Sequence, residues 1–306
     1  MDEFIGPAQA LTSALHKTYC LRLRRQYPFV YQRTLTHTAG GREITALQLG
    51  KGDRKILLTA AHHGNESLTG LVLWRFLGEY CAALRSESAI CGEQALELYH
   101  NSMVYLVPLV NPEGADLVCG CIRPDSEEYR AASAMAQQHP EVPFPSGWKA
   151  NLSGVDLNLN YPTRWEQACS IKRALGVCGP SPRDYPGRKP LDQPETKALA
   201  AFTACVRPDL MLALHAQGSV IYPGSAGAEP PGSAALAQEF SRLSGYAVEQ
   251  VPPESANAGF KDWFLQRFYR PAFTIEVGMG HNPLPLSDLD GIYRRMLPVL
   301  VHALKS

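Results

Sequence analysis

The feature that most constrains the fold is a polar junction between a short apolar run and a helical pattern, within residues 55–74. At this junction the sequence reads AAHHGNES, with His63 and Glu66 three residues apart. Side chains with this spacing share a helix face, so both can turn toward one metal ion. The alternative is a polar turn with a helix N-cap at Asn65 or Ser67.

A second histidine, His215, directly follows another apolar strand pattern, DLMLAL. In open α/β sheets, binding sites lie beyond the carboxyl ends of the strands, and the junction containing His63 also follows a strand. Two histidines, one glutamate and a water are a common ligand set for catalytic zinc. We therefore expect a third metal ligand at His215, whereas the alternative is an ordinary hydrogen-bonded histidine at the rim of the sheet.

Glu276 interrupts an apolar strand pattern at residues 273–277. A buried carboxylate is costly unless it is paired or has a function. One interpretation is an internal salt bridge. The other is a general base beside the metal ion, which would take a proton from a water during attack on a carbonyl group.

Strand and helix patterns alternate along the chain, which predicts an α/β fold with a largely parallel sheet. The sequence NPEG at residues 111–114 is typical of a turn. Neither an internal repeat nor a linker divides the chain, so we predict a single domain over residues 1–306, with a surface excursion at about 115–150. The predicted strands are 55–60, 103–108, 209–215 and 272–278, after a hairpin at 38–51, and the predicted helices are 8–21, 66–84, 194–206, 234–244 and 286–304.

The composition excludes several classes of partner. Lys plus Arg and Asp plus Glu both total 29, so the formal net charge is zero and no global field favours nucleic acid or an anionic membrane. The N-terminal residues are acidic where a signal peptide is basic, and no apolar run is long enough to span a membrane. The eight scattered cysteines are typical of reduced thiols. These observations predict a cytoplasmic protein.

Five short sequences, in this order, now identify a resemblance: HHGNES, PLVNPEG, GVDLNLNYP, LALHAQG and FTIEVG. From about residue 41 to the terminal helix, the chain resembles zinc carboxypeptidases of the M14 type. The resemblance implies a mixed, mostly parallel eight-stranded twisted sheet with helices on both faces. It also implies one zinc ion per chain, with His63, Glu66 and His215 as ligands and Glu276 as the catalytic base.

Two further stretches, WKAN before GVDLN and FTIEVGMGHNPLP, resemble those of bacterial γ-D-glutamyl-L-diamino acid peptidases. Those enzymes cut murein peptides between D-glutamate and a diamino acid such as meso-diaminopimelate. The resemblance therefore implies a murein-derived peptide as the substrate.

The chain departs from digestive carboxypeptidases at their arginines. In those enzymes an arginine follows the position of Asn158 and grips the substrate's C-terminal carboxylate, whereas here Leu159 follows. Asn65 and Ser153 also stand where relatives have arginine. We therefore expect a cation at another position to stabilise the developing oxyanion. The candidates are Lys149, Arg123 and Arg130.

Besides Lys149, three residues are candidates for substrate binding. Asn158 belongs to the GVDLN motif. Lys261 precedes an Asp-Trp pair, at the position that lines the floor of the S1′ pocket in the family, and it would attract a carboxylate. Glu254 stands where the family has a tyrosine that closes over the substrate, and it could hold an amino group. The alternative is that a gap in the chain relative to the family places Tyr246 or another residue at this position. The alternative for Lys261 is a solvated loop lysine.

Three other functions compete with a murein peptidase. One is a zinc deacylase of the aspartoacylase or succinylglutamate desuccinylase type, which shares the His-x-x-Glu motif and a distant histidine. A general metallocarboxypeptidase is the second. The third is a non-catalytic relative that binds peptides, which the missing arginines favour and the complete set of ligands and base disfavours.

Overall fold

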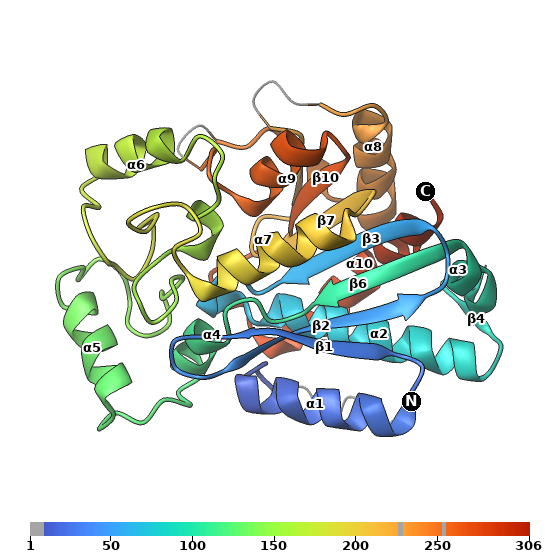
Figure 1. Ribbon diagram of the computed structural model, residues 1–306, viewed down its shortest axis with the longest axis horizontal. Coiled ribbons are helices and arrows are strands. Elements are labelled where there is room, and N and C mark those ends of the chain that lie inside the picture. The colour runs from blue at the N-terminus through green and yellow to red at the C-terminus, as the bar shows by residue number, and fades with distance from the viewer. Residues whose placement is uncertain (1–8, 226–228, 253–254) are drawn as a thin grey trace.

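The fold is built on one twisted sheet of eight strands in a computed structural model that describes residues 9–225, 229–252 and 255–306. The strand order is β1-β2-β6-β3-β7-β10-β8-β9 (Figure 1). These strands are β1 (Tyr31–His37), β2 (Glu43–Gly50), β3 (Arg54–Ala60), β6 (Ser102–Val107), β7 (Leu210–His215), β8 (Val220–Pro223), β9 (Ala247–Val248) and β10 (Ala272–Glu276). Two short strands, β4 (Ala89–Ile90) and β5 (Glu93–Gln94), pair separately.

The four central strands, β6, β3, β7 and β10, run parallel to one another, and β9 runs parallel to β8. The pairs β1–β2, β2–β6 and β10–β8 are antiparallel. The predicted mixed, mostly parallel α/β sheet is therefore confirmed. The hairpin predicted at 38–51 corresponds to the pair β1–β2, whose turn includes Gly41 in the left-handed region. Its first strand lies before the predicted range, at Tyr31–His37.

Helices flank the sheet. They are α1 (Ser13–Gln26), α2 (Leu68–Arg85), α3 (Ala95–Asn101), α4 (Pro112–Val118), α5 (Glu127–Ala136), α6 (Trp165–Ala174), α7 (Pro194–Val206), α8 (Ser233–Ser244), α9 (Phe260–Phe268) and α10 (Leu289–Lys305). Short 3-10 turns lie at η1 (Gly64–Glu66), η2 (Leu157–Leu159) and η3 (Leu286–Asp288). Within the described ranges, every helix is too short or too polar to cross a membrane.

The alternation of side chains along each strand divides the core between the two faces of the sheet. In β3, Ile56 and Leu58 pack in the core that contains residues of α2, α8 and α10. The intervening Leu57 packs with residues of α7 and α9 on the opposite face. Figure 1 shows α7 crossing in front of the sheet. Burial on both faces explains why the central strands read as continuous apolar runs.

The motif NPEG begins a helix, so our prediction of a turn was wrong. The Asn111 side chain accepts a hydrogen bond from the Gly114 N–H and caps α4, whose first residue is Pro112. An N-cap followed by proline is a helix-start signal, and the turn composition obscured it. Helices α3, α6 and α9 were also missed, because each is too short to show a clear periodic pattern.

The segment from 115 to 150 carries α5, and with α6 it lies to one side of the sheet (Figure 1). Its returning part, at Val142, Pro143, Ser146 and Gly147, forms one wall of a pocket at the carboxyl ends of the central strands. The predicted surface excursion thus contributes to the candidate site described below.

Candidate active site

The chain turns sharply where β3 ends, and this turn presents His63 and Glu66. Ala61 has a left-handed backbone (φ 53°), which is uncommon for a residue with a side chain. The Thr69 hydroxyl holds the turn, because it accepts a hydrogen bond from the Ala61 N–H and donates one to the Glu66 carbonyl. Gly64 is needed here, since a Cβ on it would lie 2.6 Å from the backbone of Gly114.

The sheet register brings the second histidine alongside. Ala60, the last residue of β3, pairs with Leu214, and His215 follows at the end of β7. His215 in turn pairs with Glu276 at the end of β10. Three parallel strands therefore deliver these side chains to one edge of the sheet, as expected for an α/β fold.

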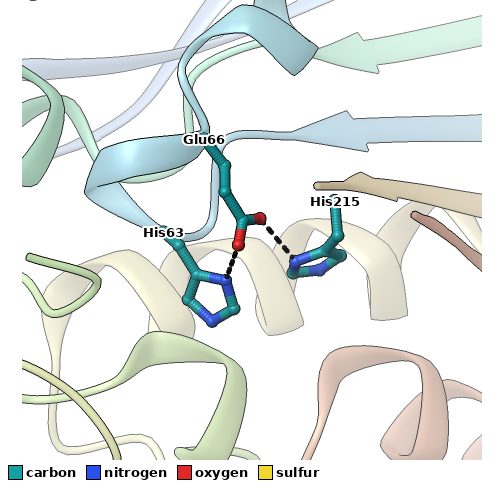
Figure 2. A group of neighbouring side chains, drawn as sticks. All are labelled: His63, Glu66 and His215. Carbon is teal, nitrogen blue, oxygen red and sulfur yellow. Dashed lines mark hydrogen bonds and ion pairs between the residues drawn. The ribbon is translucent and has the colours of Figure 1, made fainter. Parts of the chain in front are cut away.

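His63, Glu66 and His215 converge on one point (Figure 2). The Nδ1 atom of His63 lies 2.8 Å from Oε1 of Glu66, and the Nδ1 atom of His215 lies 3.0 Å from Oε2. All three side chains are buried, and their ligand atoms lie within 4.8 Å of one another. Two imidazole nitrogens facing one carboxylate form a donor set that suits zinc, so this group can hold a metal ion.

Asp156 orients His63 from the other side of the ring. Its Oδ1 atom lies 3.1 Å from Nε2 of His63. Burial lowers the pKa of His63, but the carboxylates of Glu66 and Asp156 outweigh burial and raise that pKa to about 9. Burial alone would raise the pKa of Asp156, but His63 holds it well below its usual range. A carboxylate behind a ligating histidine is the usual outer partner of a metal site.

Glu276 lies beside this group and lines the same pocket. Burial raises the pKa of the Glu276 carboxyl, and the nearby Glu66 carboxylate adds to the rise, although His215 opposes it. A carboxylate with a raised pKa is a better proton acceptor near neutral pH than an ordinary glutamate. Its position therefore suits a general base.

The pocket has a volume of about 650 Å³ and contains His63, His215 and Glu276 in its lining. This size is within the range of small-molecule and peptide sites. Its lining also includes three cationic side chains, Lys149, Arg183 and Lys261.

Comparison with known proteins decides the family. A sequence model of zinc carboxypeptidases matches residues 16–297. The chain belongs to the zinc carboxypeptidase family. It is therefore a metallopeptidase of a zinc-dependent family, and His63, Glu66 and His215 form a group able to bind the metal.

Three similar proteins define its neighbourhood in this family. The chain is 40% identical over 283 residues to gamma-D-glutamyl-L-diamino acid endopeptidase 1 of Lysinibacillus sphaericus, covering 92% of this chain and 69% of that protein. It is 36% identical to the uncharacterized protein YqgT of Bacillus subtilis (strain 168), covering 91% and 73%. The structure of thrombin-activatable fibrinolysis inhibitor shares the fold, with a TM-score of 0.74 at 18% identity, covering 97% of this chain and 74% of that one.

Of the three cations considered for the oxyanion, the structure places only Lys149 in the pocket of this zinc carboxypeptidase. Its Nζ atom lies 3.3 Å from Oε1 of Glu66. Burial lowers the pKa of Lys149, but Glu66 outweighs burial and raises it, so the side chain stays charged. Arg123 is exposed and pairs with Asp125, and Arg130 is exposed and donates to the Asp125 carbonyl, so neither reaches the pocket.

The predicted substrate-binding residues have different outcomes. Asn158 lines the pocket, and its Oδ1 atom accepts a hydrogen bond from the Phe260 N–H, which ties η2 to α9. Lys261 lines the pocket and is buried, so it is not a solvated loop lysine. Its Nζ donates to the Gly224 carbonyl and lies 3.5 Å from Oδ1 of Asp262. Glu254 lies outside the described residues.

Sequence reasoning missed Arg183, the third cation of the pocket. This residue lies in a stretch rich in proline and glycine, at 179–194, which has no periodic pattern. The signal that could have found it is the pair of charged residues in PSPRDYPG, a motif otherwise composed of turn-forming residues and one tyrosine.

Proposed function

We propose that this chain is a zinc peptidase that hydrolyses the amide bond between γ-D-glutamate and a diamino acid in murein-derived peptides. The observation that carries the proposal is the placement of Glu276 beside the group of His63, Glu66 and His215. The 40% identical relative named as a gamma-D-glutamyl-L-diamino acid endopeptidase supports the substrate class.

The proposal assigns one zinc ion to Nδ1 of His63, the carboxylate of Glu66 and Nδ1 of His215. When bound, zinc supplies Lewis-acid activation of water and of the substrate carbonyl. Asp156 holds the His63 ring in the orientation that turns Nδ1 toward Glu66.

Glu276 is the proposed general base. It takes a proton from the attacking water and later gives that proton to the leaving amine, which requires the leaving group to lie on its side of the pocket. Lys149 is the proposed partner for the negative charge that develops on the carbonyl oxygen, because this lysine lines the pocket with its Nζ atom 3.3 Å from Oε1 of Glu66. Lys261, beyond Glu276 and next to the loop after β8, would meet a carboxylate of the diamino acid.

A cytoplasmic location remains part of the proposal. All eight cysteines are free thiols, and free thiols are usual in a reducing compartment. A murein-derived peptide reaching that compartment would be a small fragment rather than the intact cell-wall polymer.

One assay tests the function. The purified protein is supplied with zinc and incubated with L-Ala-γ-D-Glu-meso-diaminopimelate, with an N-acylated amino acid, and with an α-linked dipeptide, and products are identified by mass spectrometry. The proposal predicts release of free diaminopimelate from the first substrate. Cleavage of the N-acylated amino acid alone would instead identify a deacylase, and cleavage of the α-linked dipeptide alone a general carboxypeptidase.

A further inference from the structure

Arg183 is held by the same framework that holds the metal ligands. The carbonyl of the preceding residue, Pro182, accepts hydrogen bonds from the N–H groups of Lys149 and Ala150, both at 2.9 Å. The N–H of the following residue, Asp184, donates to Oδ2 of Asp156 at 3.2 Å. Both neighbours of Arg183 are thus fixed to the wall of the pocket.

The ion pair of Arg183 belongs to a group of three charged side chains. Asp184 is shared by two cations, with its Oδ1 atom 2.6 Å from Nζ of Lys172 and its Oδ2 atom 2.7 Å from Nε of Arg183. Lys172 is buried, and its ammonium group pairs with Asp184. Two cations therefore face the one carboxylate of Asp184, and Arg183 is the cation that lines the pocket. The carboxylates of Asp156 and Glu66 also act on Arg183, but both contact His63.

The Arg183 guanidinium also has N–H groups that can donate hydrogen bonds to a ligand. Within the described part of the chain, the hydrogen bond that the structure shows for the Arg183 side chain uses Nε alone. The two terminal nitrogens of the fork remain available, and a planar fork matches a carboxylate in two parallel hydrogen bonds. Burial lowers the pKa of Arg183, but Asp184 outweighs burial and, together with the carboxylates of Asp156 and Glu66, raises it, so the side chain stays charged.

The order of the strands shows at which end of the pocket Arg183 lies. Asp156 accepts a hydrogen bond from the N–H of Asp184, the residue after Arg183, and also contacts His63, which follows β3. Arg183 is therefore placed near the end of β3. Lys261 contacts the loop after β8, which lies beyond β7 and β10 in the sheet. His215 and Glu276 therefore lie between the two cations. Because Glu276 must reach the leaving amine, the leaving residue lies toward Lys261 and the acyl residue toward Arg183.

We propose that Arg183 binds the free α-carboxylate of the acyl D-glutamyl residue and so selects γ-linked over α-linked substrates. This inference rests on the proposed function. In a γ-glutamyl amide the side-chain carboxyl group is the one attacked, and the α-carboxyl group stays free and ionised. In an α-linked glutamyl peptide the α-carboxyl group is consumed in the bond, and the free carboxylate lies at the end of the side chain instead, at a different position relative to the attacked carbonyl group. A fixed cation on the acyl side therefore distinguishes the two linkages.

Two substrates that differ only at this group test the inference. They are L-Ala-γ-D-Glu-meso-diaminopimelate and its α-carboxamide form, in which D-isoglutamine replaces D-glutamate. The parent enzyme should favour the carboxylate in kcat/KM by about ten- to a hundredfold, the usual effect of one charged hydrogen bond. Arg183→Gln should lose that factor on the carboxylate substrate and stay within about threefold of the parent on the carboxamide.

Controls separate binding from structure. Arg188→Gln changes an exposed arginine in the same segment and should preserve the parent's substrate ratio. Arg183→Lys keeps the charge without the fork and should restore part of the preference. Equal losses on both substrates in Arg183→Gln, or no preference in the parent, would overturn the role of Arg183 while leaving the peptidase intact. Cleavage of neither substrate by the parent would overturn the proposed function, and this inference with it.

Discussion

Asp156 and Glu66 contact the two nitrogens of the His63 imidazole: Oδ1 of Asp156 lies 3.1 Å from Nε2, and Oε1 of Glu66 lies 2.8 Å from Nδ1. The ring therefore cannot turn without breaking one of these contacts. This arrangement fixes Nδ1 as the atom offered to a metal and makes the ligand more basic.

The first prediction follows from that contact. Asp156→Asn should weaken zinc binding by about ten- to a hundredfold, because the amide is a weaker partner for the ring N–H than a carboxylate. Competition with a chelator of known affinity measures the change. Asp125→Asn, at an exposed carboxylate, is the matched control and should bind zinc as the parent does. A zinc affinity for Asp156→Asn within about threefold of the parent would show that Asp156 does not support the ligand.

The second prediction concerns Glu276. Glu276→Gln should keep zinc and the fold but lose about a hundred- to ten-thousandfold in kcat, because the amide has nearly the same volume and cannot accept the proton. Steady-state hydrolysis together with zinc content checks this. If turnover stays within about threefold of the parent, the base is another group.

The metal group was predictable because His63 and Glu66 follow the end of one apolar strand and His215 ends another. The sequence around His63 and His215 shows where two strands stop, and the parallel topology brings such ends together. Glu276 was identifiable for a related reason, since a carboxylate in an apolar strand is unusual.

The walls of the pocket were less predictable. Arg183 and the pocket-lining part of the excursion lie in loops, whose path depends on distant contacts rather than on periodicity. The backbone bonds from Lys149 to Pro182 illustrate the point, because they join two loops with no shared pattern. Arg123 and Arg130, two of the candidates for the oxyanion, do not reach the pocket, because the path of the excursion leaves both exposed and in contact with Asp125.

The third prediction concerns Lys261. Lys261→Met should lower kcat/KM on γ-D-Glu-diaminopimelate peptides by about ten- to a hundredfold, because a buried cation at this end of the pocket can meet the side-chain carboxylate. The loss should be much smaller on the L-lysine analogue, which lacks that carboxylate. Parallel kinetics on the two peptides give the answer. The same loss on both would mean that Lys261 acts only through its contacts with Gly224 and Asp262.

The fourth prediction concerns stability and pH. Glu195 is buried, and burial raises its pKa from 4.5 to about 7. The folded state therefore holds this proton more tightly than the unfolded state. The contribution of the protonated Glu195 carboxyl to the free energy of unfolding is complete below pH 4.5, and it is lost as the pH rises through about 7.

Glu195→Gln should remove this pH dependence, because the amide resembles the protonated acid. Relative to the parent, the variant should gain about 1–3 kcal/mol in the free energy of unfolding between pH 5 and pH 8. Urea unfolding at the two pH values measures it. The matched control is Glu97→Gln, at an exposed position on α3, and it should show no such gain. Parallel pH profiles for the parent and Glu195→Gln would contradict the assignment.

The central claim is that His63, Glu66 and His215 hold one catalytic zinc ion, and the zinc content of His215→Ala tests it most directly. The parent and the control His139→Ala, which changes a histidine outside the pocket, should each retain about one zinc per chain after dialysis. Elemental analysis of His215→Ala should show zinc far below one per chain and no peptidase activity, because two ligands bind zinc much more weakly than three. Full zinc occupancy in His215→Ala would contradict the account.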